Sequence, residues 1–192
     1  MSPDSKRRPR SDAQRNRERL IAAARELVAE VGSEVALDEV ARRAGVGNAT
    51  LYRHFPARAE LFAALYTDEV TTLCDYGGQL LAAPSPIEAL FAWLDAFVAH
   101  VATKRPLALA ATEVPDGRRT PMFEEWHAAI TATASRLIRR AQPALRPDIT
   151  ATDVLALASG AALTTDPDNA RRLVALLRTG LAAGSSSTTD HS

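Results

Sequence analysis

The stretch GVGNATLYRHF, residues 45–55, combines two glycines, an asparagine and a cluster of basic and aromatic residues within eleven positions. Treated as a helix of 3.6 residues per turn, it places Leu51 and Phe55 on one face and Thr50 and Arg53 on the other. The first face is suited to a core, whereas the second is small, polar and cationic. This division predicts a short helix that is held by one side and presents the other.

A second short helix is predicted immediately before it, over LDEVARRA, residues 37–44. Two short helices joined by AGVGN have the spacing of a helix-turn-helix, here over about residues 36–55. Ala41 allows the helices to approach closely, and Gly45 tolerates the conformation of the turn. Such a pair can present its second helix to a DNA major groove. A plain corner between two helices of a bundle remains an alternative.

The rest of the chain also has helical periodicity, without an alternating apolar–polar run that would indicate a strand. We therefore predict an all-α fold. Capping residues mark helix starts at Ser11, Ser85 and Thr150, and Gly32 marks a helix end. About nine helices are expected, over residues 12–31, 37–44, 49–55, a stretch after Pro56, 86–104, part of 105–120, 121–142, 151–165 and 168–182.

The charge is unevenly distributed although the net charge is zero. Residues 1–60 contain 12 Lys and Arg against 9 Asp and Glu, and the remainder contains 11 against 14. A basic end on a neutral chain suits a polyanionic partner, although a solvated tail is the alternative. No stretch approaches the roughly 20 uncharged apolar residues of a membrane helix, and the N-terminus lacks the apolar region of a secretory signal. We expect a cytoplasmic protein without a membrane partner.

Residues with catalytic or metal-binding chemistry do not cluster in the sequence. The histidines at positions 54, 100, 127 and 191 are far apart, and Cys74 is the single cysteine, which we interpret as a helix-filling residue. No catalytic triad, metal-ligand spacing or phosphate-binding loop is present. We therefore predict no enzyme activity, no catalytic residue, no metal and no cofactor.

The motifs RERLIAAARELVAEVG, residues 17–32, and LDEVARRAGVGNATLYRHFPARAELFAAL, residues 37–65, resemble the TetR family of transcriptional regulators. The resemblance covers about residues 15–69. It implies a homodimer that binds a near-palindromic double-stranded DNA operator and is released by a small-molecule effector. Two positions depart from the family pattern: Ala36 replaces a frequent Ser or Thr, which puts a phosphate contact there in doubt, and Gly47 replaces a frequent Ser, which leaves Asn48 as the expected helix cap.

The resemblance also implies roles for individual residues and domains. Thr50 and Arg53 are candidates for base edges, and Tyr52, His54 and Arg58 for phosphates, although Tyr52 half-buried against the first helix is an alternative. The full predicted DNA-binding set is Asn48, Ala49, Thr50, Tyr52, Arg53, His54 and Arg58. The expected domains are a disordered basic arm over 1–10, a DNA-binding domain over 11–56, an effector-binding and dimerisation domain over 57–183, and a disordered tail over 184–192.

Aromatic residues suggest where an effector would bind. Trp93, Phe97 and His100 share one helical face, and Phe123, Trp126, His127 and Ile130 share another. An aromatic cavity with one or two polar anchors suits a small hydrophobic ligand, although such a stripe can be plain core.

The last two helices are predicted to form the dimer interface as a four-helix bundle across a two-fold axis. Small residues around Gly160 permit close approach of helices. The predicted interface is Leu157, Gly160, Ala161, Leu173, Leu176, Leu177 and Leu181, although these residues could instead complete the monomer core. A ligand-independent DNA-binding dimer, or a protein-interaction adaptor, remains the alternative function.

Overall fold

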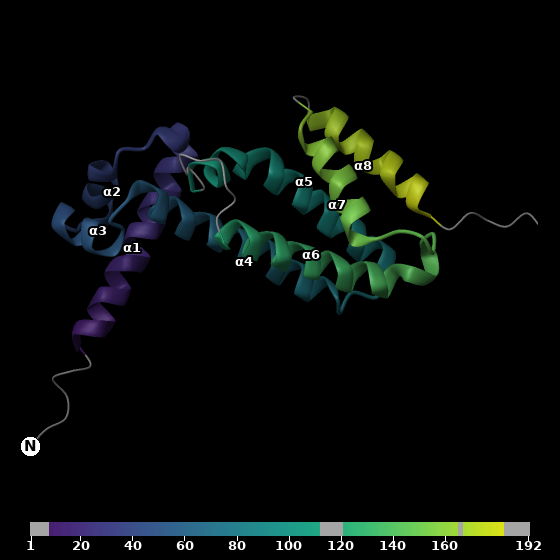
Figure 1. Ribbon diagram of the computed structural model, residues 1–192, viewed down its shortest axis with the longest axis horizontal. Coiled ribbons are helices and arrows are strands. Elements are labelled where there is room, and N and C mark those ends of the chain that lie inside the picture. Colours follow the sequence, from purple (N-terminus) through teal and green to yellow (C-terminus); the bar gives the residue numbers. More distant parts are fainter. Residues whose placement is uncertain (1–7, 112–120, 165–166, 183–192) are drawn as a thin grey trace, which may run out of the picture. The chain divides into compact units, whose positions relative to one another are not determined.

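The computed structural model describes residues 8–111, 121–164 and 167–182, and all of its regular elements there are helices (Figure 1). The eight α-helices are α1 Arg8–Val31, α2 Leu37–Ala44, α3 Asn48–His54, α4 Arg58–Leu80, α5 Pro86–Ala111, α6 Pro121–Ala141, α7 Ala151–Ala162 and α8 Pro167–Leu181. The all-α prediction is confirmed. The chain divides into two compact units, residues 1–68 with 104–122 and residues 69–103 with 123–192.

Several helix boundaries follow from the caps that the sequence predicts. Gly32, with φ of 78°, follows the last residue of α1. Thr150 forms a capping box at the start of α7: its hydroxyl accepts from the Asp153 amide at 3.2 Å, and the Asp153 carboxylate accepts from the Thr150 amide at 3.1 Å. Before α5, the Ser85 hydroxyl accepts from the Glu88 amide at 3.4 Å.

Two predictions of helix boundaries were wrong. Helix α1 begins at Arg8, so Ser11 lies inside the helix and does not cap it. Helix α5 continues through Pro106 to Ala111, so residues 105–111 form no separate helix. Proline removes one amide donor and crowds the carbonyl four residues earlier, but burial of Leu107 and Ala111 favours continuation of the helix. Residues 1–7, 112–120 and 184–192, which include most of the predicted arm and the whole predicted tail, lie outside the described residues.

The first unit holds its helices on a small apolar core. Helices α1, α2 and α3 lie together in Figure 1 and contact one another. Each contributes side chains from one face, which is the amphipathic pattern expected of surface helices. The core residues include Leu20, Ala24 and Leu27 of α1, Val40, Ala41 and Ala44 of α2, Leu51 of α3, Phe55, and Leu61 and Leu65 of α4.

The second unit is organised around Trp93. This side chain is fully buried, and its indole N–H donates to the Leu73 carbonyl at 3.0 Å. Gly77 lies next to it: a Cβ atom there would be 2.8 Å from the Trp93 Nε1 atom and would overlap the Thr133 methyl group. Segments of α4, α5 and α6 therefore approach one another at a glycine.

Helix α5 is, among the described residues, the one that is long and apolar enough to cross a membrane by length and composition. The apolar stretch of α5 is therefore longer than the sequence analysis expected of any segment. Its buried residues include Leu90, Trp93, Leu94 and Phe97, and 44% of its most apolar window is buried inside the protein. A core helix of a folded protein passes the same test of length and composition.

Candidate functional site

The helix-turn-helix depends on the backbone conformation of Gly45. This residue has φ of 64° and ψ of 37°, a left-handed conformation that residues with a Cβ adopt at a cost. The turn is closed by the Val46 amide, which donates to the Ala41 carbonyl at 3.0 Å. Helix α2 therefore ends where the sequence predicted, and the chain is redirected into α3.

The start of α3 differs from the expectation that Asn48 caps it. Gly47 occupies the cap position, with φ of −74° and ψ of 151°, and Asn48 is the first helical residue. The Asn48 side-chain amide instead donates to the Asp38 carboxylate at 3.0 Å. Asn48 thus connects α3 to α2, because its side chain starts one position too late to reach the amides that a cap serves.

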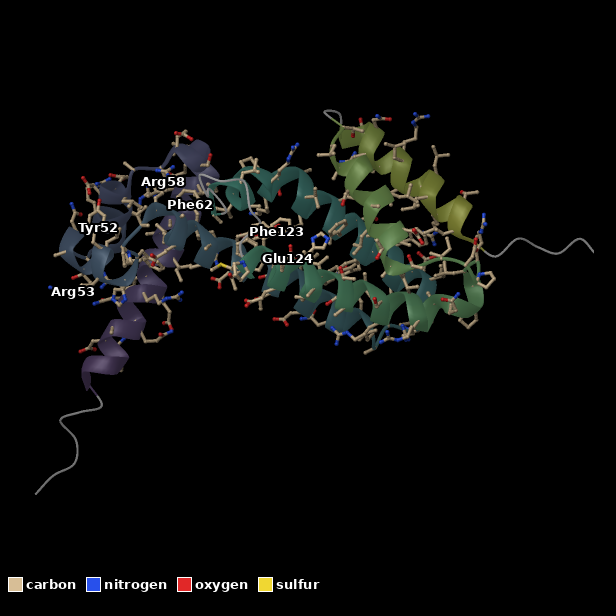
Figure 2. All side chains as sticks on the ribbon, in the orientation of Figure 1. Tyr52, Arg53, Arg58, Phe62, Phe123 and Glu124 are labelled. Atoms are coloured by element: carbon tan, nitrogen blue, oxygen red, sulfur yellow. The ribbon has the colours of Figure 1, made fainter. Side chains whose placement is uncertain are left out.

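The two faces of α3 have the chemistry that its sequence predicted. Leu51 is 1% exposed. On the outer side, Ala49, Tyr52 and Arg53 are exposed, and Thr50 and His54 are half-buried. Tyr52 and Arg53 are labelled on α3 in Figure 2. Tyr52 is 47% exposed, so its ring is available at the surface.

Arg58 does not have the free guanidinium group that a phosphate contact requires. Its Nη1 donates to the Val35 carbonyl at 2.5 Å, its Nη2 donates to the Ser33 carbonyl, and the group lies 4.7 Å from the Phe62 ring centroid (Figure 2). These carbonyls precede α2, so the guanidinium group links that segment to the start of α4. The structure therefore favours a positioning role for Arg58.

Two arginines of α1 border the motif, and the sequence analysis did not assign them. The Arg17 guanidinium lies 5.3 Å from the Phe55 ring centroid, just beyond α3. The Arg19 guanidinium lies beside Gly45, close to where a Cβ atom would stand. The signal that could have identified them was the excess of arginine in the first helix.

Ion pairs surround the outer side of α2. Arg43 binds Glu30 of α1 at 2.8 Å, and Arg42 binds Glu39 within α2 at 2.5 Å. The hydrogen bond from Arg43 lowers the pKa of Glu30, and the one from Arg42 lowers the pKa of Glu39. The described residues contain no group of three or more His, Cys, Asp or Glu residues that could hold a metal ion.

The residues predicted to bind an effector are mostly core residues. Trp93 and Phe97 stack on each other with ring centroids 5.7 Å apart, and His100 is 7% exposed. Trp126 and Ile130 are also buried, while Phe123 stacks on the exposed ring of His127 at 5.7 Å.

A cavity in the second unit is lined by other residues. It has a volume of about 820 Å³ and is bounded by α5, α7 and α8. Its lining is Phe91, Asp95, Val98, Ala99, Ala102, Thr103, Ala162, Thr164, Ala170, Arg171, Val174, Ala175 and Arg178, and includes none of the seven predicted residues. The cavity opens on a different face of α5 from the one that carries the predicted aromatic residues, because large aromatic side chains fill space and small ones leave it open.

Six of the seven residues predicted for the dimer interface line one groove between α7 and α8. The groove has a volume of about 430 Å³ and is formed by Leu157, Gly160, Ala161, Leu173, Leu176, Leu177 and Gly180. Leu157 and Leu176 are 57% and 56% exposed. Leu181 differs: it is 2% exposed, and its carbonyl accepts from the Arg146 amide at 3.0 Å, which holds the end of α8 inside the fold.

Comparison with known families matches both parts of the chain. Residues 20–65 match the family described as bacterial regulatory proteins, tetR family. Residues 85–183 match the family described as transcriptional regulator SbtR-like, C-terminal domain. A search of curated proteins found no match.

Solved structures agree with these matches. A TetR transcriptional regulator from Streptomyces coelicolor is 36% identical, with a TM-score of 0.69 over 86% of this chain and 98% of its own. A TetR transcription regulatory protein from Mycobacterium vanbaalenii is 34% identical, with a TM-score of 0.68 over 91% of this chain and 99% of its own. The chain therefore belongs to the TetR family of DNA-binding transcriptional regulators.

Proposed function

We propose that this protein is a cytoplasmic repressor that binds a near-palindromic operator as a homodimer and leaves it when a small-molecule effector binds. The observation that carries the proposal is α3, which is fixed by buried Leu51 and Phe55 and presents Ala49, Tyr52 and Arg53 to solvent. A helix anchored in this way can place its outer side chains in a major groove without losing its core.

The proposed contacts divide into two kinds. Arg53, with Thr50 beside it, reads base edges, because a guanidinium group can donate two hydrogen bonds to guanine. Tyr52 and His54 contact phosphates, which contribute affinity without sequence information. Arg58 acts indirectly by holding the segment before α2.

The groove between α7 and α8 is the proposed dimer surface. It exposes Leu157 and Leu176 to water, next to Gly160 and Gly180, where a second helix can approach closely. A second copy of the chain would cover these leucines on both subunits. A two-fold axis through this contact would present two copies of α3, which is why the operator is expected to be near-palindromic.

The cavity beside α8 supports the effector part of the proposal. One side of α8 lines the cavity through Val174 and Arg178, and another side lines the groove through Leu173 and Leu176. A ligand in the cavity would therefore press on the same helix that forms the dimer surface, which provides a physical path for coupling. Two structures of the same fold are a gamma-butyrolactone receptor, 24% identical with a TM-score of 0.60, and a complex with resorcinol, 20% identical with a TM-score of 0.61.

The test begins with selection of an operator from a random duplex library long enough for two half-sites about 10 base pairs apart. The purified protein and its Arg53→Ala variant are then titrated on the selected duplex and on a scrambled one, at several salt concentrations. We expect Arg53→Ala to lose roughly five- to a hundredfold of the preference for the selected duplex, which corresponds to about 1–3 kcal/mol.

The matched control is Arg139→Ala, which removes an exposed arginine from α6. It should leave both affinities unchanged. If Arg53→Ala weakens both duplexes equally, Arg53 is a phosphate contact and not a base reader. If selection enriches no sequence, the operator proposal itself fails.

A further inference from the structure

The cavity of the second unit is large enough for a drug-sized molecule. Its volume of about 820 Å³ falls within the range of small-molecule sites, roughly 300–1,000 Å³. The space exists because the facing positions of α5 and α8 carry small side chains, among them Ala99, Ala102 and Ala175. Most of the wall is therefore apolar, which requires a ligand with a substantial apolar body.

The charged residues of the wall are not equivalent. Arg178 binds Glu88 and lies 5.1 Å from the Phe91 ring centroid, and Arg171 binds Asp168. Each arginine thus already has a carboxylate partner that does not line the cavity. Asp95, in contrast, has no hydrogen-bond partner within the described ranges, although the charge of Arg178 is nearby.

Partial desolvation raises the pKa of Asp95, and the nearby charge of Arg178 partly opposes this effect. The Asp95 side chain is still exposed to water, and a bound apolar body would exclude that water, which is unfavourable for the carboxylate unless a positive charge or a hydrogen-bond donor replaces it. An anionic ligand would compete with Glu88 or Asp168 for an arginine, whereas a cationic ligand would meet a carboxylate that has no hydrogen-bond partner among the described residues.

We propose that this cavity binds a hydrophobic organic cation, with Asp95 as its counter-ion and the small apolar residues of α5 and α8 around its body. This inference names the chemical class of the effector and rests on the proposed role of the protein as a ligand-responsive regulator. The stacking of Arg178 on Phe91 shows that an aromatic face of the same wall already accommodates a cation.

The test uses two probes of nearly the same shape and opposite charge, tetraphenylphosphonium and tetraphenylborate. Their binding to the full-length protein without DNA is measured by isothermal titration calorimetry, with thermal shift as a second readout. We expect the phosphonium to bind the wild-type protein, and to bind Asp95→Asn roughly tenfold or more weakly. The borate should bind no more weakly to Asp95→Asn than to the wild-type protein.

Two further variants locate the site. Asp75→Asn removes an exposed carboxylate of α4 that does not line the cavity, and it should leave phosphonium binding unchanged. Ala99→Phe fills the cavity and should abolish phosphonium binding while the thermal transition stays cooperative.

Equal binding of both ions, or equal binding of the phosphonium to wild type and Asp95→Asn, would overturn the inference. Absence of phosphonium binding in a protein that still prefers its selected operator would also overturn it and leave the regulator proposal standing. Asp95-dependent binding in a protein that selects no operator would support the cation site and contradict the DNA-binding proposal.

Discussion

The outer face of α3 and the groove between α7 and α8 are both exposed surfaces, but they have opposite chemistry. Helix α3 exposes Tyr52 and Arg53 above a buried leucine, whereas the groove exposes Leu157 and Leu176 beside glycines. Tyrosine and arginine can remain hydrated until a charged polymer arrives. Exposed leucines, in contrast, contribute a favourable free energy of binding when an apolar surface covers them and removes them from water. The outer face of α3 therefore suits reversible binding of a polyanion, whereas the groove suits permanent burial in a protein–protein interface.

The largest expected effect comes from placing charge in the groove. Leu157→Asp combined with Leu176→Asp should convert a dimer into a monomer at micromolar concentration. Each substitution removes about 1.5–3 kcal/mol of favourable apolar burial, and each is present in both subunits of a symmetric dimer. Sedimentation velocity measures the outcome, and affinity for the selected operator should fall with it. Val31→Asp, at a position 62% exposed in the first unit, serves as the control. A double variant that remains dimeric would show that the groove is not the interface.

Substitution of Arg58 tests whether the proposed DNA-reading surface depends on contacts inside the first unit. Arg58→Ala should destabilise the protein by roughly 1.5–3 kcal/mol, because the bonds from a charged group to the Val35 and Ser33 carbonyls are lost. Operator affinity should fall while the salt dependence of binding stays the same. Chemical denaturation and salt titrations measure the two effects. A reduction of the salt slope by about one unit, with unchanged stability, would instead restore the phosphate contact implied by the family resemblance.

Two adjacent glycines of α4 test the packing of the second unit. Gly77→Ala should cost about 1–3 kcal/mol of stability, because its methyl group would meet Trp93 and Thr133. Gly78→Ala meets nothing within 4 Å and should stabilise the helix by about 0.5–1 kcal/mol. Denaturation curves of both variants provide the comparison. If Gly77→Ala is as stable as Gly78→Ala, the close approach at Gly77 is not rigid.

The smallest effect concerns the surface pair between Arg43 and Glu30. The hydrogen bond from Arg43 holds the pKa of Glu30 below its usual 4.5 in the folded state. Its stabilising effect is therefore present above about pH 4.5 and is lost as the pH falls through the lower folded pKa. An NMR titration of the Glu30 carboxyl should show this pKa rising toward 4.5 in Arg43→Gln. An unchanged pKa in that variant would show that the pair does not form in solution.

Much of the first unit could be predicted because its determinants are local. The turn needs Gly45, α3 needs buried Leu51 and Phe55, and these residues lie within a single stretch of eleven. Arg58 illustrates the complementary case. Its partners Val35 and Ser33 are more than twenty positions earlier in the chain. Helical periodicity does not indicate which distant carbonyls a side chain will contact.

Local patterns were enough to predict the all-α class, the helix-turn-helix, the capped start of α7 and the apolar residues of the α7–α8 surface, because helical periodicity and caps are set by residues within a few turns of one another. Long-range packing was needed to establish which face of α5 borders a cavity, that Leu181 belongs to the core, and that Gly77 and Gly78 have different surroundings. These outcomes depend on the volume left between helices that are distant in the sequence. This volume is set by the side chains of several packed helices together, so the periodicity of a single helix does not predict it.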